Sequence, residues 1–168
     1  LAELDAMDVT KLSRENQVDA AILRNQLQYD IWGSETLQGW AWDPQVYSGL
    51  AGSAVYGLMA REFAPLPQRL GSAITRMEKL PALFAQAREN LDPARVPQIH
   101  AQTAADQNKG ILSIVDTFIT PNLKELPEAE RARAEKATTA LQAAVTHDQE
   151  WLDKTLVRIA KREFRADH

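Results

Sequence analysis

The sequence has no cysteine among its 168 residues. This excludes disulfide bonds and thiolate metal sites, although it leaves the compartment open, because exported proteins can lack cysteine too. Glycine is scarce, with seven residues, whereas Ala, Leu, Gln, Glu and Arg, which favour helix, are abundant. No segment alternates apolar and polar residues for long enough to predict a strand. The composition therefore predicts an all-α protein.

Long apolar runs and an excess of positive charge are also missing. No stretch reaches the roughly 18 apolar residues that a membrane helix needs, so we expect no membrane span. The uncharged segment 44–60 contains Gln45, Ser48, Ser53 and three glycines, and we interpret it as a buried helix. The net charge of −4 provides no general attraction for nucleic acid. The chain opens on an acidic stretch without an initiator methionine or a signal peptide, which indicates that upstream sequence was removed or not included.

The length and composition suit one domain. With 45% apolar and 25% charged residues, the chain can bury a core of ordinary size. We predict a single helical domain or fragment over residues 1–168. Its fold is expected to be an irregular bundle of about five to seven helices, with proline at the connections.

The first long helix is expected over residues 14–37, with Ser13 as its N-cap. It has two apolar stripes at helical spacing, which lie on roughly opposite faces. One contains Val18, Ile22, Tyr29 and Trp32, and the other contains Leu23, Leu27 and Ile31. A helix that is apolar on both sides is buried between neighbours, so this pattern indicates the inside of a larger assembly.

The second helix is expected to begin at Asp43 and Pro44, a capping residue followed by proline at the first helical position. Gly49, Ser53 and Gly57 recur every four residues and form a narrow face. Because glycine destabilises a helix interior by about 0.5–1 kcal/mol relative to alanine, we predict that another helix packs closely on this face. We also expect the two tryptophans at 40 and 42 to anchor the preceding loop in the core.

Four further helices are expected over 66–79, 81–91, 97–120 and 127–163, separated by prolines at 65, 67, 93, 97 and 127. Each has an apolar stripe that we predict faces the core. The predicted inward residues are Leu70, Ile74, Met77, Leu80, Leu83, Phe84 and Ala87, then His100, Ala104, Ile111, Val115 and Phe118, and finally Ala134, Leu141, Val145, Leu152, Leu156 and Ile159.

Motifs that carry chemistry are absent. His100, His147 and His168 are too far apart for a helical zinc motif, and neither a nucleophile elbow nor a phosphate-binding loop appears. His147 and Glu150 form one H-x-x-E pair, whereas a bundle di-metal site needs two such pairs and two further glutamates, so we interpret the pair as a solvated one. We therefore predict no catalytic residue, no metal ligand and no cofactor in this chain.

Asp148 is unusual because it lies on the apolar stripe of the last helix, between Val145 and Leu152. A buried carboxylate needs a partner such as an arginine or a backbone N–H. Alternatively, a capping box from Thr146 to Gln149 breaks the helix at this point. A structural role is favoured over a catalytic one, since structural ion pairs also produce such placements.

Several polar or aromatic residues near helix ends are candidates for a substrate cleft, namely Trp40, Tyr47, Arg61 and His100. His100 is otherwise interpreted as a core histidine with a satisfied hydrogen bond. Arg61, Glu62 and Arg69 cluster near the Pro65 turn, where we expect an ion network that stabilises the turn rather than a groove.

The order of four segments resembles one bacterial family, the domain-of-unknown-function family 885. The segments are "NQVDAAILRNQLQYDIW", "WDPQVYSGL", "YGLMAREFAPLPQRLGSAITRMEKLPALFAQARENLD" and "QIHAQTAADQNKG", and the match runs from about Leu1 to Phe164. The resemblance implies an N-terminal portion of a helical protein several times longer, similar to zincin-type metallopeptidases. The family's zinc motif lies far downstream, so this chain lacks the catalytic half and inherits no metal ligand.

The resemblance therefore predicts a non-catalytic scaffold or cleft-wall region of a zinc-dependent hydrolase, inactive by itself. Its partners would be the remainder of the same polypeptide and, in the parent, a peptide substrate, with zinc only in the missing part. Relatives with export or lipoprotein signals imply a periplasmic or envelope location, with a cytoplasmic one still open. The alternatives are a stand-alone helical interaction module without catalysis and a bundle with its own ligand or metal site. The length of the full protein would distinguish the scaffold region of a hydrolase from the stand-alone interaction module. The oligomeric state is left open.

Overall fold

The computed structural model describes residues 1–160, which form helices and turns with no strand. The predicted all-α bundle is thus confirmed. The chain divides into two compact units, residues 1–39 and the part from Trp40 onward.

The first unit is one long helix with an N-terminal arm against it. The arm contains α1 (Ala2–Asp5) and the short turn η1 (Val9–Lys11), and the long helix is α2 (Arg14–Trp32), continued by a π-helical turn, η2 (Gly33–Leu37). Ser13 caps α2 as predicted, because its Oγ accepts a hydrogen bond from the backbone N–H of Asn16 at 3.3 Å. Arg24 of α2 holds the arm through its Nε atom, 2.7 Å from Oδ1 of Asp5.

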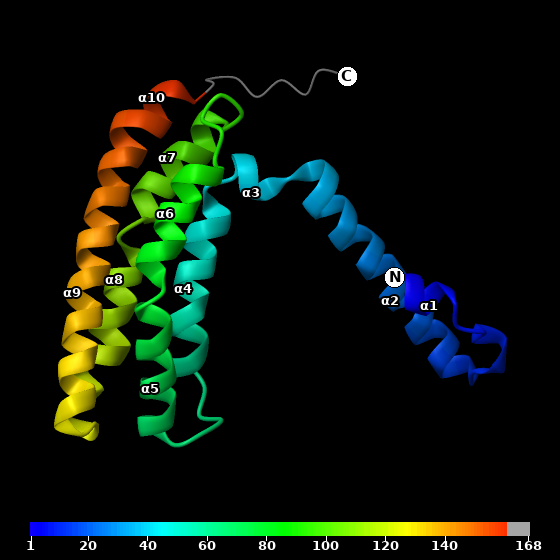
Figure 1. Ribbon diagram of the computed structural model, residues 1–168, viewed down its shortest axis with the longest axis horizontal. Coiled ribbons are helices and arrows are strands. Elements are labelled where there is room, and N and C mark those ends of the chain that lie inside the picture. The colour runs from blue at the N-terminus through cyan, green and yellow to red at the C-terminus, as the bar shows by residue number, and fades with distance from the viewer. Residues whose placement is uncertain (161–168) are drawn as a thin grey trace. The chain divides into compact units, whose positions relative to one another are not determined.

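The second unit is an antiparallel bundle of four helical rods (Figure 1). A rod is here either one helix or several helices that follow one another in the chain in the same direction. The short α3 (Gly39–Trp42) begins at the unit boundary and leads into the first rod, α4 (Gln45–Met59). The second rod is α5 (Leu66–Met77) with α6 (Leu80–Asn90). The third rod consists of α7 (Gln98–Gln107), α8 (Gly110–Ile114) and η3 (Val115–Ile119). The short η4 (Thr120–Glu125) connects it to the fourth rod. The fourth rod consists of α9 (Glu128–Trp151), η5 (Leu152–Leu156) and α10 (Val157–Ile159).

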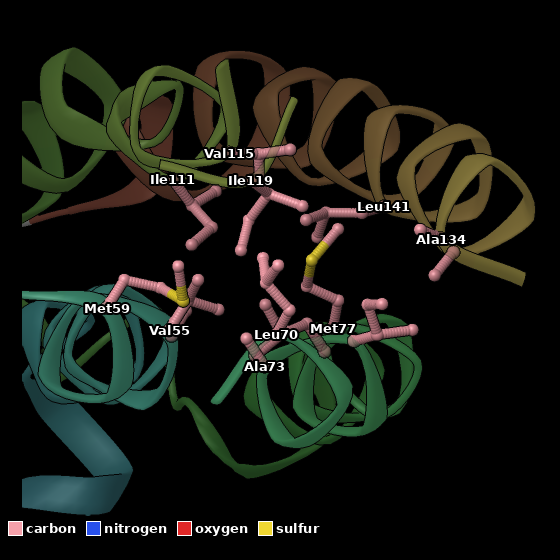
Figure 2. Packing of buried hydrophobic residues seen from close by; sticks show 14 of the residues in the cluster. Val55, Met59, Leu70, Ala73, Met77, Ile111, Val115, Ile119, Ala134 and Leu141 are labelled. Carbon is pink, nitrogen blue, oxygen red and sulfur yellow. The ribbon is translucent and has the colours of Figure 1, made fainter. Parts of the chain in front are cut away.

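The core lies between the four rods. Figure 2 shows Met77 of α5 pointing toward Leu141 of α9, with Ile119 of the third rod close by. Nearly all the predicted inward residues are buried, among them Leu70, Ile74, Met77, Val115, Leu141, Val145 and Leu156. A second cluster, which includes Tyr47, Val96, Ala101 and Leu156, continues the core toward the end of the bundle that carries α3.

Two predicted helices differ from the structure. The helix expected over 97–120 is broken after Gln107, where Asn108 is buried and its amide Nδ2 donates to the carbonyl of Val145 at 3.0 Å. The last helix is described only to residue 160, so its predicted end at 163 lies outside the described residues. Ile159, predicted to face the core, is exposed, since only one helical turn follows the π-helical η5.

One packing prediction is wrong, and two others stay predictions, because the expected neighbours are not found within the unit that carries each helix. Trp40 is exposed rather than anchored in the core, and the residue of α3 that is buried is Ala41. On α4, an added Cβ at Gly49 or at Gly57 would meet nothing within 4 Å, so no helix within residues 40–160 packs closely there. On α2, Ala20 is the buried residue and both apolar stripes are largely open.

Candidate functional site

A polar cluster of the bundle lies where α3, the start of α4 and the start of α7 meet. Asp43 caps α4, because its Oδ1 accepts a hydrogen bond from the backbone N–H of Gln45 at 3.0 Å. The same Oδ1 lies 3.0 Å from Nδ1 of His100, in the first turn of α7. One carboxylate oxygen therefore joins the starts of the two helices through Asp43 and His100, which are 57 residues apart in the chain.

Two groups compete for one nitrogen of the His100 ring. The amide Nε2 of Gln45 lies 3.1 Å from Nδ1, the atom that also faces Asp43. This nitrogen donates to Asp43 when it carries a proton and accepts from Gln45 when it does not. The ring of Trp42 packs edge-on against the imidazole, with the centroids 5.5 Å apart. These contacts fix the orientation of the ring, while the pair remains partly open to solvent.

Tyr47 lies at the same end of the bundle and is buried. Its hydroxyl donates to the carbonyl oxygen of Trp40 at 2.7 Å and accepts from Nδ2 of Asn90 at 3.1 Å. Nearby, the backbone N–H of Asp92 donates to the carbonyl of Ala41 at 2.8 Å. The α3 segment is thus bound to the rods at two consecutive carbonyls.

The structure brings together three of the four predicted cleft residues. Trp40 and Tyr47 share a hydrogen bond, and His100 binds Asp43, which follows three residues after Trp40. Arg61 is exposed beyond the opposite end of α4, and the 15 residues of that helix span about 22 Å. Sequence reasoning missed Asp43 and Gln45 as partners of His100, although Asp43 was expected as a cap.

Arg69 does not take part in the predicted ion network. It is buried, and its guanidinium donates from Nε to the carbonyl of Ala64 at 2.9 Å and from Nη1 to that of Met59 at 3.1 Å. Arg61 and Glu62 are exposed and form no ion pair with it. The prediction is wrong because the carbonyls at the end of α4 lack helical partners and attract the arginine more strongly than exposed charges do.

Asp148 has the arginine partner that its position demanded. Its Oδ1 lies 2.8 Å from Nη1 of Arg88, and both side chains are mostly buried. Burial raises the pKa of Asp148, while the hydrogen bond and charge of Arg88 oppose that shift. The alternative prediction, a capping box at Thr146 that breaks the helix, is wrong, since α9 continues to Trp151.

A small cavity lies beside this ion pair. Its volume is about 20 Å³, and its lining includes Asp148, Asn108, Tyr47 and Ser48. A space of that size holds roughly one water molecule when polar groups line it. It is too small for a substrate or a cofactor.

A larger groove runs along α4 next to the His100 cluster. It has a volume of about 330 Å³ and is lined by Gln45, Ser48, Gly49, Gly52, Gln107, Gly110, Ile111 and Ile114. Its lining carries amides and apolar groups but no charge. In residues 1–160, no group of three or more His, Asp or Glu side chains is placed to hold a metal ion. The groove therefore offers hydrogen-bonding and apolar contacts.

On the opposite side, Arg133 of α9 binds Glu78 after α5 through two hydrogen bonds of 2.7 and 2.6 Å. This arginine holds the pKa of Glu78 below its usual range. The pair borders an open groove of about 510 Å³ with a floor of alanines. It is an exposed clamp between two rods, and Arg133 also donates to Oγ1 of Thr75 at 2.9 Å and to Oε2 of Glu130 at 3.3 Å.

A family match decides the relationship of this chain to known proteins. Residues 1–167 match the family described as "Bacterial protein of unknown function (DUF885)". The chain belongs to this family. The resemblance inferred from the sequence is confirmed at this level.

Two similar proteins extend the comparison. A solved structure described as "a putative lipoprotein of unknown function" from Shewanella oneidensis shares 28% identity with a TM-score of 0.82, covering 94% of this chain and 29% of its own. Trigger factor from Mycolicibacterium smegmatis is 30% identical over 97 residues, which are 58% of this chain and 19% of that protein. The chain thus spans less than a third of either relative. None of the helices in residues 1–160 is long and apolar enough to cross a membrane.

Proposed function

We propose that this chain is a scaffold region of a larger DUF885 protein, whose exposed apolar surfaces pack against the rest of that polypeptide. The observation that carries the proposal is α2. Its side chains at Val18, Ile22, Tyr29 and Trp32 are between 43% and 63% exposed, and Leu23 on another face is 50% exposed. A helix with apolar side chains on several faces needs more protein around it than this unit provides.

The similar Shewanella structure supports the same proposal. Its chain contains this fold within a length more than three times greater, since the match covers 29% of it. Burial of one large apolar side chain stabilises a fold by about 1.5–3 kcal/mol, so covering α2 would contribute strongly to the stability of a longer polypeptide.

The activity proposed for the longer polypeptide is that of a zinc-dependent hydrolase, with a peptide as substrate and the catalytic residues outside this chain. It rests on the resemblance to zincin-type peptidases alone. In that protein the end of the bundle around Trp40, Tyr47 and His100 is proposed as a cleft wall, with Arg61 as a separate candidate at the far end. The lipoprotein description of the Shewanella structure supports an envelope location in the proposal.

Backbone hydrogen exchange on two proteins tests the scaffold role. The samples are the 168-residue chain and the product of the whole gene. We expect amides of α2 to exchange slowly only in the longer product, while α9, which is packed within the bundle, is protected in both. Equal exchange of α2 in both samples, or a gene that stops directly after His168, would favour the stand-alone interaction module.

The enzymatic part is tested on the same two samples by zinc content and by cleavage of a peptide library. We expect zinc and cleavage with the longer product only. Alanine variants of Trp40, Tyr47, Arg61 and His100 in that product then test the cleft wall. Turnover equal to that of the unmodified protein for all four would remove these residues from the substrate site.

A further inference from the structure

The apolar stripe on α2 has the spacing of a helix–helix seam. It contains Val18, Ile22, Asn25, Tyr29 and Trp32, which follow one another at intervals of four, three, four and three residues. This is the heptad spacing at which a side chain of one helix inserts between four side chains of another. We call these five residues the α2 seam.

The rest of the first unit leaves the α2 seam open. The N-terminal arm covers another side of α2, where Ala20 is buried and Arg24 binds Asp5. The seam residues are all exposed, and the side-chain amide of Asn25 makes no hydrogen bond within residues 1–160. The rings of Tyr29 and Trp32 lie 6.1 Å apart and form one continuous aromatic surface.

The positions that flank the seam carry little charge. They are Asp19, Ala21, Gln26 and Gln28. Separate chains that form coiled coils select their partners through opposite charges at these flanking positions. A helix on the same polypeptide needs no such selection, because the covalent connection makes the contact intramolecular. The composition of the flanks therefore favours an intramolecular partner over a second copy.

We propose that the α2 seam packs against one helix of the same polypeptide beyond residue 168, and that this helix presents a hydrogen-bonding side chain opposite Asn25. This inference rests on the proposed scaffold function and specifies its partner. The length of the related chain supports the choice of occupant, since most of the Shewanella structure lies outside the matched region. The polar requirement follows from burial, because an amide buried without a partner is destabilising.

Single cysteines test the seam, since the natural chain has none. We would place them at Ile22 and Tyr29 on the seam, at Leu23 on the other apolar stripe for comparison, and at Asp30 as the exposed control on the same helix. In the product of the whole gene, the thiol reaction rate at positions 22 and 29 should fall by about tenfold or more relative to the 168-residue chain, because a buried thiol reacts only after local opening. The rate at position 30 should not change.

Other patterns of protection would overturn the inference in distinguishable ways. Protection at position 23 without protection at 22 and 29 would keep the scaffold function and reject the seam. Protection at no position would reject both. If 22 and 29 are already protected in the 168-residue chain, concentration dependence would indicate a second copy, and its absence would indicate the second unit of this chain.

A photo-reactive residue at position 25 tests whether the partner is a helix. In the longer product, cross-links should fall within one segment after His168, at positions three or four residues apart, and that segment should contain a polar side chain. Cross-links at alternate residues or scattered over several segments would overturn the helical partner. A gene that ends directly after His168 would overturn the proposal altogether.

Discussion

Oδ1 of Asp148 lies 2.8 Å from Nη1 of Arg88, so an ion pair joins α9 to the last turn of α6, 60 residues earlier. The pair is set among apolar side chains beside the small cavity. Removing one member of a buried pair leaves an uncompensated charge, whereas replacing both can be neutral. This contact ties the second rod of the bundle to the fourth.

Replacing Arg88 by methionine is expected to destabilise the chain by about 3 kcal/mol at pH 7, because the Asp148 carboxylate would stay buried without its partner. Burial already raises the pKa of Asp148 above its usual 3.8, and loss of Arg88 removes the opposing effect. A carboxyl whose pKa is higher in the folded than in the unfolded state favours folding in its protonated form. The free energy of unfolding that it contributes is therefore lost as pH rises. The Arg88→Met destabilisation should therefore shrink toward pH 4, as urea unfolding at several pH values would show.

The double variant Arg88→Met/Asp148→Leu is the control for that experiment. It removes both charges and should recover most of the lost stability at pH 7. A double variant as unstable as Arg88→Met alone would mean that packing of the arginine stem, not its charge, stabilises this region.

The need of Asp148 for a partner could be predicted from the sequence, but Arg88 could not be identified. The need follows from periodicity, because the position lies between Val145 and Leu152 on a buried stripe. The identity of the partner depends on how far α6 slides along α9, which no local pattern records. For the same reason His100 could be chosen as a site candidate while its contacts with Gln45 and Trp42 could not.

The open faces of α2 and α4 show a different limit of sequence-based prediction, which concerns what covers a helix face. Helical periodicity correctly placed the apolar residues of α2 on shared faces of that helix, and the small residues of α4 on one face of theirs. It could not show whether their cover lies within this chain, because a stripe of Val18 and Ile22 has the same pattern whether a neighbour is present or not. Arg69 shows a third limit, since carbonyls left unpaired at the end of a helix compete with acidic side chains and leave no mark in the sequence.

Tyr47→Phe should cost about 1–2 kcal/mol, because the change removes a buried hydroxyl that binds both the carbonyl of Trp40 and the amide of Asn90. Backbone hydrogen exchange should quicken in α3 before it quickens in the rest of the bundle. The matched control is Tyr56→Phe on the same helix, since Tyr56 is half exposed and stacks edge-on with Phe118 through its ring alone. Equal losses for the two variants would contradict a special role for the Tyr47 hydroxyl.

Asp43→Ala should cost about 1 kcal/mol or somewhat more, because it removes both the cap of α4 and the partner of His100. A double-mutant cycle with His100→Ala separates the two losses in thermal or urea unfolding. We expect a coupling energy of about 0.5–1.5 kcal/mol between the two positions, since they share one hydrogen bond. Strict additivity would mean that Asp43 acts only as a cap.

Gly57→Ala and Gly49→Ala should each stabilise the 168-residue chain by about 0.5–1 kcal/mol, because alanine favours helix and the added methyl groups would meet no atom within 4 Å. Gly52→Ala is the matched comparison on the same helix, since its methyl group would contact Cδ1 of Ile114 at an ordinary 3.7 Å. Urea unfolding of the three variants measures the differences. If a neighbour packs closely on the face formed by Gly49 and Gly57, as the sequence pattern predicted, those two substitutions would instead destabilise the chain while Gly52→Ala would not. Stabilisation by all three would place any close partner of α4 outside this chain.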